Sequence, residues 1–350
     1  MRALYTIGDA QYNLGEIEAA LSTYRSVIAR FPSHPLASEA AKSMQVALLG
    51  MGRTQEALDI ADTLINANPQ SGAAEDFAFK KAEIFYSGRN YSNAAAELEA
   101  YMKRYPSSQR QDEALYLLGR TYLTMNELGQ ARASFADVEK RFPKSPFIVA
   151  SKIDLAEYFT GRANSASADS LYEIVWTEFA SDTDGASRAG FERGVSARMH
   201  GDTAMAIVRF RETADRYAGQ EYADQSRYQV AVLYRRIGNI DSALYHFGLL
   251  ALRTDKPQFA SNALYDLGTI YLREKRYAEA MAQYERVRQE YAGYEDWYTL
   301  SLLALGESYE ILKRVDEAKD VYEVVARLRP DDDYGKTAEA RLKRLKKARR

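Results

Sequence analysis

Small and apolar residues recur along the chain at the spacing of an amphipathic helix, and the whole pattern recurs every 37 or 38 residues. One position of this repeat is alanine each time. Its nine occurrences are Ala20, Ala57, Ala94, Ala131, Ala168, Ala206, Ala243, Ala280 and Ala318. A fixed period of this length indicates an array of similar helical units rather than several globular domains.

Two other positions are restricted in size at fixed distances from that alanine. With Met1 as position 1, the alanine is position 20; position 8 is Gly or Ala in eight of nine repeats, and position 24 is aromatic in seven. We expect helix A over positions 2–14 and helix B over positions 18–30, joined by a turn that often has Gly at position 15. A small residue at position 8 facing the alanine lets the helices pack closely, and the ring fills the space beside that contact.

Helix B is expected to end at an aromatic residue followed by proline, because proline cannot continue a helix and disfavours helical backbone before it. Such pairs are Phe31-Pro32, Tyr105-Pro106 and Phe142-Pro143. The sequence therefore predicts nine helix pairs over residues 1–330. They begin near residues 1, 38, 75, 112, 149, 187, 224, 261 and 299.

This pattern resembles the tetratricopeptide repeat (TPR): small at position 8, Tyr at 11 as in Tyr122 and Tyr309, Ala at 20, aromatic at 24 and Pro at 32. The resemblance implies an all-α, right-handed solenoid of about nine helix-turn-helix repeats whose concave face, lined by helix A, binds other proteins. Repeats 2, 3 and 5 match less well, and the period exceeds the family's usual value of about 34. We expect the additional residues to lengthen the loops between repeats, as in 142–146.

The linkers between repeats further resemble those of periplasmic TPR proteins of the bacterial outer-membrane assembly and Tol–Pal systems. This resemblance predicts a periplasmic or envelope-associated scaffold in cell-envelope assembly. Two alternatives are open: a cytoplasmic adaptor similar to a co-chaperone, and the docking domain of a larger enzyme.

Residues 331–350 have the composition of a capping helix. Ala338, Leu342 and Leu345 share one helical face, with aspartates before them and a run of cations, including Arg349 and Arg350, after them. This distribution complements the helix dipole, so we expect a helix that covers the last repeat. The alternative is a basic tail that binds nucleic acid or anionic lipid.

The amino end shows no such cap. Met1 falls directly inside the first helix A, without a Ser, Thr, Asp or Asn before it. We therefore expect the chain to be a fragment, and we consider self-association through this first repeat as a further hypothesis.

Composition narrows the range of functions. The formal net charge of −2 and the pI near 6.1 give no general basic stripe, so we expect no nucleic-acid partner. The absence of cysteine excludes disulfides, thiolate zinc sites and a cysteine nucleophile. No apolar run approaches the roughly 20 residues that a transmembrane helix needs.

No pattern typical of catalysis or metal binding occurs. His34, His200 and His246 are far apart and belong to no ligand motif, and neither a P-loop nor a dinucleotide-binding motif is present. Paired carboxylates such as Glu16 and Glu18 are expected on solvent-facing turns. We therefore predict a protein that is not an enzyme and has no metal or cofactor.

The concave face remains as the candidate binding surface. Position 5 is aromatic in six of nine repeats, and positions 9, 12 and 13 provide arginines. Rings and arginines often dominate binding energy, and arginine can hold a carboxylate with two hydrogen bonds. The candidate residues for a partner that is acidic or has a free C-terminus are Tyr116, Arg120, Phe191, Arg198, Tyr228, Arg235, Arg236, Tyr265 and Arg273. In the alternative interpretation, the rings pack between helices and the arginines pair with acids on adjacent helices.

Overall fold

The computed structural model describes residues 1–31 and 34–348, and over these residues it confirms the predicted all-α fold, with nineteen helices and no strand. The first nine helices are α1 (Arg2–Asn13), α2 (Ile17–Arg30), α3 (Pro35–Gly50), α4 (Thr54–Ala67), α5 (Gly72–Ser87), α6 (Tyr91–Arg104), α7 (Gln111–Thr124), α8 (Leu128–Arg141) and α9 (Phe147–Thr160). The others are α10 (Ser165–Glu178), α11 (Thr183–Met199), α12 (Thr203–Arg216), α13 (Glu221–Arg236), α14 (Ile240–Ala251), α15 (Pro257–Arg273), α16 (Tyr277–Glu290), α17 (Glu295–Ile311), α18 (Val315–Leu328) and α19 (Asp333–Ala348). The features predicted at Pro32, Arg349 and Arg350 lie outside the described residues.

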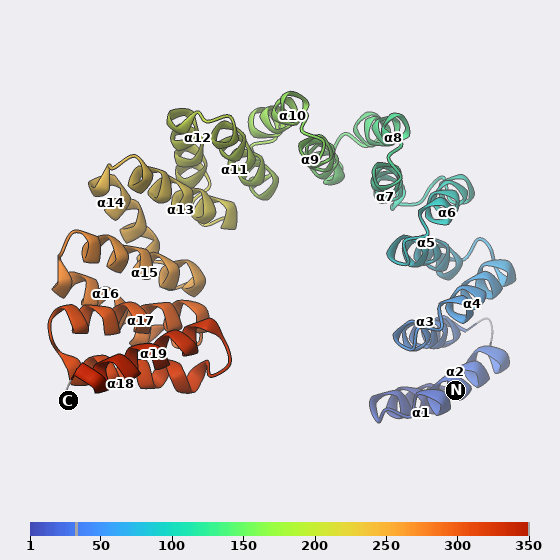
Figure 1. Cartoon of the computed structure of the whole chain (residues 1–350). Helices are drawn as coiled ribbons and strands as arrows, with labels where there is room; N and C mark the ends of the chain where they lie inside the picture. The colour runs from blue at the N-terminus through green and yellow to red at the C-terminus, as the bar shows by residue number, and fades with distance from the viewer. Residues whose placement is uncertain (32–33, 349–350) are drawn as a thin grey trace. The chain divides into compact units, whose positions relative to one another are not determined.

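The chain divides into two compact units, whose helices are labelled in Figure 1. Unit 1 is Met1–Arg162 and contains α1–α9, and unit 2 is Ala163–Arg350 and contains α10–α19. The division falls inside the predicted repeat 5, whose helices α9 and α10 belong to different units. In unit 1, helices that follow each other in sequence pack as neighbours, and the same is true within unit 2.

The ring at position 24 covers the glycine at position 8. A Cβ atom on Gly8 would lie 2.6 Å from Tyr24 Cε1, and one on Gly268 would lie 2.4 Å from Tyr284 Cε1. The ring therefore fills the space beside position 8, as expected. Glycine is needed in these repeats because a Cβ atom would collide with the ring where it now lies, whereas repeats 5 and 7 have Ala156 and Ala231 at this position.

Repeat 2 reverses these sizes. Gln45 stands at position 8 and Ala61 at position 24, and Gln45 Nε2 donates a hydrogen bond to the Ala57 carbonyl at 3.1 Å. The larger side chain now comes from helix A rather than from helix B. Both Gln45 and Ala61 are buried, so the pair fills the same interior space.

The turn from helix A to helix B has one backbone conformation throughout. Position 15 has a positive φ in every repeat. It is glycine at Gly15, Gly52, Gly201 and Gly238, and another residue at Arg89, Asn126, Ala163, Lys275 and Lys313. Glycine adopts this left-handed conformation without the steric cost of a Cβ atom, so the five other residues are held there by the packing of the two helices.

Helix A begins earlier than predicted in repeats 2–9. In repeat 6, for example, α11 begins at Thr183 rather than near residue 188, and in repeat 8 α15 begins at Pro257 rather than near residue 262. The Asp182 side chain accepts a hydrogen bond from the Gly185 amide at 3.0 Å, and proline suits the first turn of a helix. The additional residues of the long period therefore extend helix A in most repeats, although residues 142–146 do form a loop between α8 and α9.

The predicted capping helix is present as α19. Ala338, Leu342 and Leu345 are buried against α17 and α18. Glu310 of α17 accepts a hydrogen bond from Tyr322 at 2.7 Å and forms an ion pair with Arg341 at 3.3 Å. The last helix therefore closes the core of unit 2 through both apolar and charged contacts.

Candidate protein-interaction surface

Several tyrosines at position 5 form a hydrogen bond with the residue at position 6 of the next repeat. Tyr116 donates to Asp154 Oδ2 at 2.9 Å, and Tyr228 donates to Asp266 Oδ2 at 2.8 Å. In repeat 1, the hydroxyls of Tyr5 and Ser43 lie 3.4 Å apart. Burial, and then the nearby carboxylate, raise the pKa values of Tyr116 and Tyr228 above the usual tyrosine value.

Three of the candidate arginines have partners at the same position 6. Arg120 Nε lies 3.2 Å from Asp154 Oδ2, and Arg235 Nη1 lies 2.5 Å from Asp266 Oδ1. Arg198 Nη1 donates to Gln229 Oε1 at 3.1 Å. These arginines, together with the two tyrosines, therefore connect one repeat to the next, as the alternative interpretation supposed.

Phe191 and Tyr265 are candidate rings that pack against other aromatic side chains. The Phe191 ring centroid lies 5.5 Å from that of Phe210, and the Tyr265 centroid lies 6.1 Å from that of Tyr284. Both candidates are half-buried, so part of each ring remains accessible. Position 6 of the repeat after Tyr265 is Ala304, which offers no acceptor, and burial raises the pKa of Tyr265.

A tryptophan that the sequence analysis did not identify lies beside Tyr265. The centroid of the half-buried Trp297 ring is 5.7 Å from that of Tyr265. Trp297 belongs to the first turn of α17, in the part of helix A that the sequence assigned to a loop. A search of the sequence for aromatic residues just before each predicted helix A would have identified Trp297.

Arg236 and Arg273 are exposed to solvent. Each stands at position 13, in the last turn of its helix A. Over residues 1–31 and 34–348, neither has an ion pair or a side-chain hydrogen bond. We refer to Tyr265, Trp297, Arg236 and Arg273 as the open set, because the two rings are only half-buried and the two arginines have no ion pair among the described residues.

The three histidines lie in separate surroundings. His34 accepts a hydrogen bond from the Leu36 amide at 3.1 Å at the start of α3, and His200 lies 2.8 Å from the Ser196 carbonyl. His246 is buried and stacks on Tyr234, and burial lowers its pKa. Among the described residues, no group of three His, Cys, Asp or Glu could hold a metal ion.

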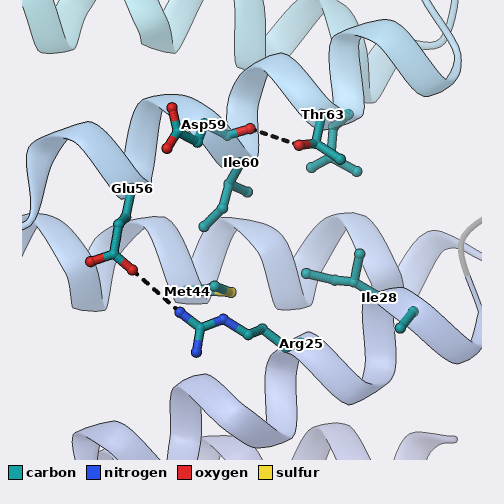
Figure 2. Close-up of a pocket in the computed structure, with 9 residues that line it drawn as sticks. Arg25, Ile28, Met44, Glu56, Asp59, Ile60 and Thr63 are labelled. Carbon is teal, nitrogen blue, oxygen red and sulfur yellow. Dashed lines mark hydrogen bonds and ion pairs between the residues drawn. The ribbon is translucent and has the colours of Figure 1, made fainter.

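Unit 1 contains a hollow of about 340 Å³ between α2 and α4, with α3 as its floor. Figure 2 shows Ile28, Met44 and Ile60 around it, with the Arg25–Glu56 ion pair at 3.4 Å on one side. Its walls come from two helices B, α2 and α4. Glu56 is also bound by Arg53, whose hydrogen bond lowers the pKa of Glu56.

Comparison with known proteins matches the chain to the tetratricopeptide repeat over residues 2–34, 46–109, 79–146, 228–295 and 300–332. The C-terminal part of a TPR repeat-containing protein from Cytophaga hutchinsonii has 14% identity and a TM-score of 0.52, with 74% of this chain and 98% of that chain covered. The fold of that structure is therefore shared.

Two other solved structures superpose less closely on this chain. A tetratricopeptide repeat protein from Parabacteroides merdae has 14% identity, coverage of 75% and 98%, and a TM-score of 0.44. The protein pilF from Pseudomonas aeruginosa has 18% identity, coverage of 65% and 96%, and a TM-score of 0.43. No curated protein matches the sequence. None of the described helices is both long enough and apolar enough to cross a membrane.

Proposed function

Because the chain belongs to the tetratricopeptide repeat family, we propose that it is a non-catalytic scaffold that binds an extended segment of a partner protein on the helix-A face of unit 2. TPR arrays suggest protein–protein interaction, and the fold by itself does not specify the partner. The proposal therefore rests on side chains of this face.

The open set is the single observation that supports this site. Tyr265 and Trp297 form a half-buried pair of rings, and Arg236 and Arg273 add two unpaired charges from consecutive repeats. Tyrosine, tryptophan and arginine are the residues that most often dominate binding energy at interfaces. The chemistry suits a segment with acidic side chains or a free C-terminal carboxylate, which arginine binds through two parallel hydrogen bonds.

The other candidate residues have different roles in this proposal. Phe191 and Arg198 extend the surface toward repeat 6, while Tyr228 and Arg235 keep repeats 7 and 8 in register through Asp266. In unit 1, Tyr116 and Arg120 make the corresponding connection through Asp154, and they form no part of the site in unit 2.

We place the scaffold in the bacterial cell envelope, in the periplasm or attached to it, because of its aromatic–proline linkers. A cytoplasmic adaptor similar to a co-chaperone and a docking domain of a larger enzyme are the competing functions. The complete gene distinguishes them: a signal peptide or lipid-attachment sequence supports the envelope, and a fused catalytic domain supports the enzyme.

A fluorescence titration tests the binding site. In a Trp176→Phe background, Trp297 is the only tryptophan, so its emission reports on the open set. The probes are a glutamate-rich peptide with a free C-terminus, the same peptide amidated, and a lysine-rich peptide. We expect saturable binding of the first, weakened about tenfold or more by Arg273→Glu, since charge-assisted hydrogen bonds contribute about 1.5–3 kcal/mol. Lys140→Glu, an exposed position on α8, is the control and should change nothing.

Self-association through the first repeat is a second proposal with its own observation. Ile7 of α1 and Leu14 at its C-cap are exposed, at 49% and 75% of their surface. Light scattering over a dilution series tests it, with Ile7→Ser as the variant. A mass that stays monomeric at every concentration rejects this association.

A further inference from the structure

The turns from helix A to helix B follow one edge of unit 2. Arg198 of α11 reaches Gln229 of α13, and Arg235 of α13 reaches Asp266 of α15. α15 in turn packs against α17, and α17 against α19, which Figure 1 shows side by side. The C-terminal ends of these A helices therefore lie next to one another along unit 2. The turns that begin at these ends lie in the same order.

The C-terminal part of α19 reaches the same edge. Arg341 and Arg344 both pair with Glu310, which is the last residue but one of α17. Lys346 and Lys347, one turn further along α19, therefore lie near the turn that follows α17. We use the name turn edge for the exposed residues Met199, Ile237, Lys275, Ile311, Leu312, Lys313, Lys346 and Lys347.

The turn edge presents apolar side chains to solvent in three of the four repeats of unit 2 that have both helices. Met199, Ile237, Ile311 and Leu312 expose between 41% and 73% of their surface. They stand at or beside the C-cap of helix A, outside the buried interior. Packing within the fold therefore gives no reason for four apolar residues here, and clusters of exposed apolar residues are typical of interaction surfaces.

Unpaired cations lie between these apolar residues. Lys275, Lys313, Lys346 and Lys347 are exposed, and in the part of the chain that the structure describes none has an ion-pair partner. Arg236 and Arg273 of the open set stand directly beside this edge. The acids nearby are Asp202, which caps α12, and the exposed Asp241, Glu274 and Asp316. Asp316 pairs with Lys319 at 3.6 Å, and Glu279 and Glu317 pair with Arg276 and Arg314.

The corresponding turns of unit 1 provide an internal comparison. Leu14 and Met51 are exposed there as well. Their charged neighbours are Glu16 and Glu18, and Arg53 is already paired with Glu18 and Glu56. Exposed apolar turns therefore occur in both units. Among the described residues, unit 1 has one exposed, unpaired cation at position 15, Arg89, whereas unit 2 has Lys275 and Lys313 at this position and Lys346 and Lys347 on α19.

We propose that the turn edge of unit 2 binds the surface of a lipid bilayer that contains anionic phospholipid. Lysines bind lipid phosphates electrostatically, and apolar side chains enter the region between headgroups and acyl chains. The charge of such a bilayer is complementary to the edge, and its flat surface suits side chains that project from successive repeats in a row. This inference goes beyond the proposed function, because it uses different residues and a different ligand.

Vesicle sedimentation with the full chain tests the proposal. The probes are vesicles of phosphatidylcholine alone and of phosphatidylcholine mixed with phosphatidylglycerol. We expect binding to the mixed vesicles only, and we expect it to weaken as salt is raised, because salt screens surface charge. The double variant Lys275→Gln/Lys313→Gln should lower the partition coefficient about 25-fold, at about fivefold for each lysine.

Apolar variants and matched controls complete the test. Ile237→Ser/Leu312→Ser should also weaken binding to the mixed vesicles. Met51→Ser, an exposed apolar residue on the unit 1 turn, and Lys140→Gln, an exposed lysine on α8, should leave it unchanged. All these positions are exposed, so the variants should keep the helical circular dichroism of the parent.

Any other outcome contradicts the proposal. The edge is not a membrane surface if the protein binds neither kind of vesicle, or if the lysine and apolar variants bind as the parent does. Binding of soluble polyglutamate that is lost in Lys275→Gln/Lys313→Gln, without vesicle binding, would assign the edge to an acidic protein instead. Peptide binding through Trp297 and Arg273 is measured separately, so the two proposals fail independently.

Discussion

Tyr228 donates its hydroxyl proton to Asp266 across the boundary between repeats 7 and 8, at 2.8 Å. Arg235 binds the other oxygen of the same carboxylate, at 2.5 Å. Asp266 is only 6% exposed, so the two donors compensate for the burial of its charge. A ring and an arginine that sequence alone assigns to ligand binding thus stabilise the stacking of repeats.

Removing this hydroxyl should lower the stability of the protein. Tyr228→Phe leaves Asp266 with one donor fewer, and we expect the free energy of unfolding to fall by about 1–3 kcal/mol, because an acceptor in a buried site loses a partner. Urea unfolding followed by circular dichroism measures the change. Tyr245→Phe, on a tyrosine that is 62% exposed, is the matched control and should be neutral.

Where position 8 is glycine, a side chain should be destabilising. In Gly268→Ala the new methyl group would lie 2.4 Å from Tyr284 Cε1, so the ring or the helix must shift. We expect a loss of about 1–3 kcal/mol, the usual cost of overpacking. Gly248→Ala in α14 meets no atom within 4 Å and should instead stabilise by up to about 1 kcal/mol. Equal thermal midpoints for the two variants would contradict this interpretation.

At position 15, where the backbone is left-handed, a change to glycine should stabilise the protein. Arg89 has φ near 59° and an exposed side chain, so Arg89→Gly removes a steric cost without removing a contact. We expect the unfolding free energy to rise by up to about 1 kcal/mol, since the relief of about 1–2 kcal/mol is partly offset by the greater freedom of glycine in the unfolded chain. Lys140→Gly, within α8, should lower it by a similar amount. A decrease for both variants would show that the turn stores no strain.

These features differ in how far the sequence reveals them. The restriction at positions 8, 20 and 24 is visible because it recurs at one period, and it predicts the helix pairs. The partners of Tyr116 and Tyr228 were missed because each acid lies 38 residues downstream, where a single aspartate looks like any solvated charge. An acid one repeat and one residue after a position-5 tyrosine is the signal that would have identified both pairs.

Other features have no local sequence signal. Trp297 was missed because the start of helix A depends on caps such as Asp182 rather than on the apolar period. The division between units 1 and 2 falls within repeat 5, and no proline-rich or charged segment marks it. Whether an arginine is free or paired, as in Arg236 and Arg235, depends on which face of the last helical turn it occupies.

Stability should also depend on pH through His246. Burial, and then the Arg227 charge, lower its pKa below the usual value of 6.5, with Arg211 acting in the same direction and Asp215 opposing them. The unfolded chain therefore takes up a proton at a pH where the folded protein does not. The free energy of unfolding should fall as the pH drops below about 6.5, and the fall should cease below the folded-state pKa.

His246→Phe isolates this effect, because it keeps an aromatic ring stacked on Tyr234 without a titrating nitrogen. The difference in unfolding free energy between about pH 8 and pH 5 should be smaller in the variant than in the parent. His200→Phe is the control, since His200 is exposed. If His246→Phe and the parent have the same pH dependence, His246 is not the cause.

Photo-crosslinking in cells tests the central claim, that the open set of unit 2 binds a protein partner, most directly. A photoreactive phenylalanine replaces Trp297 on the helix-A face or, in a parallel strain, the exposed Tyr245 on α14. We predict a discrete protein adduct from position 297 that is lost when Arg236→Glu and Arg273→Glu are added, and none from position 245. Adducts from position 245 alone, or adducts from position 297 that survive both charge reversals, would contradict the claim.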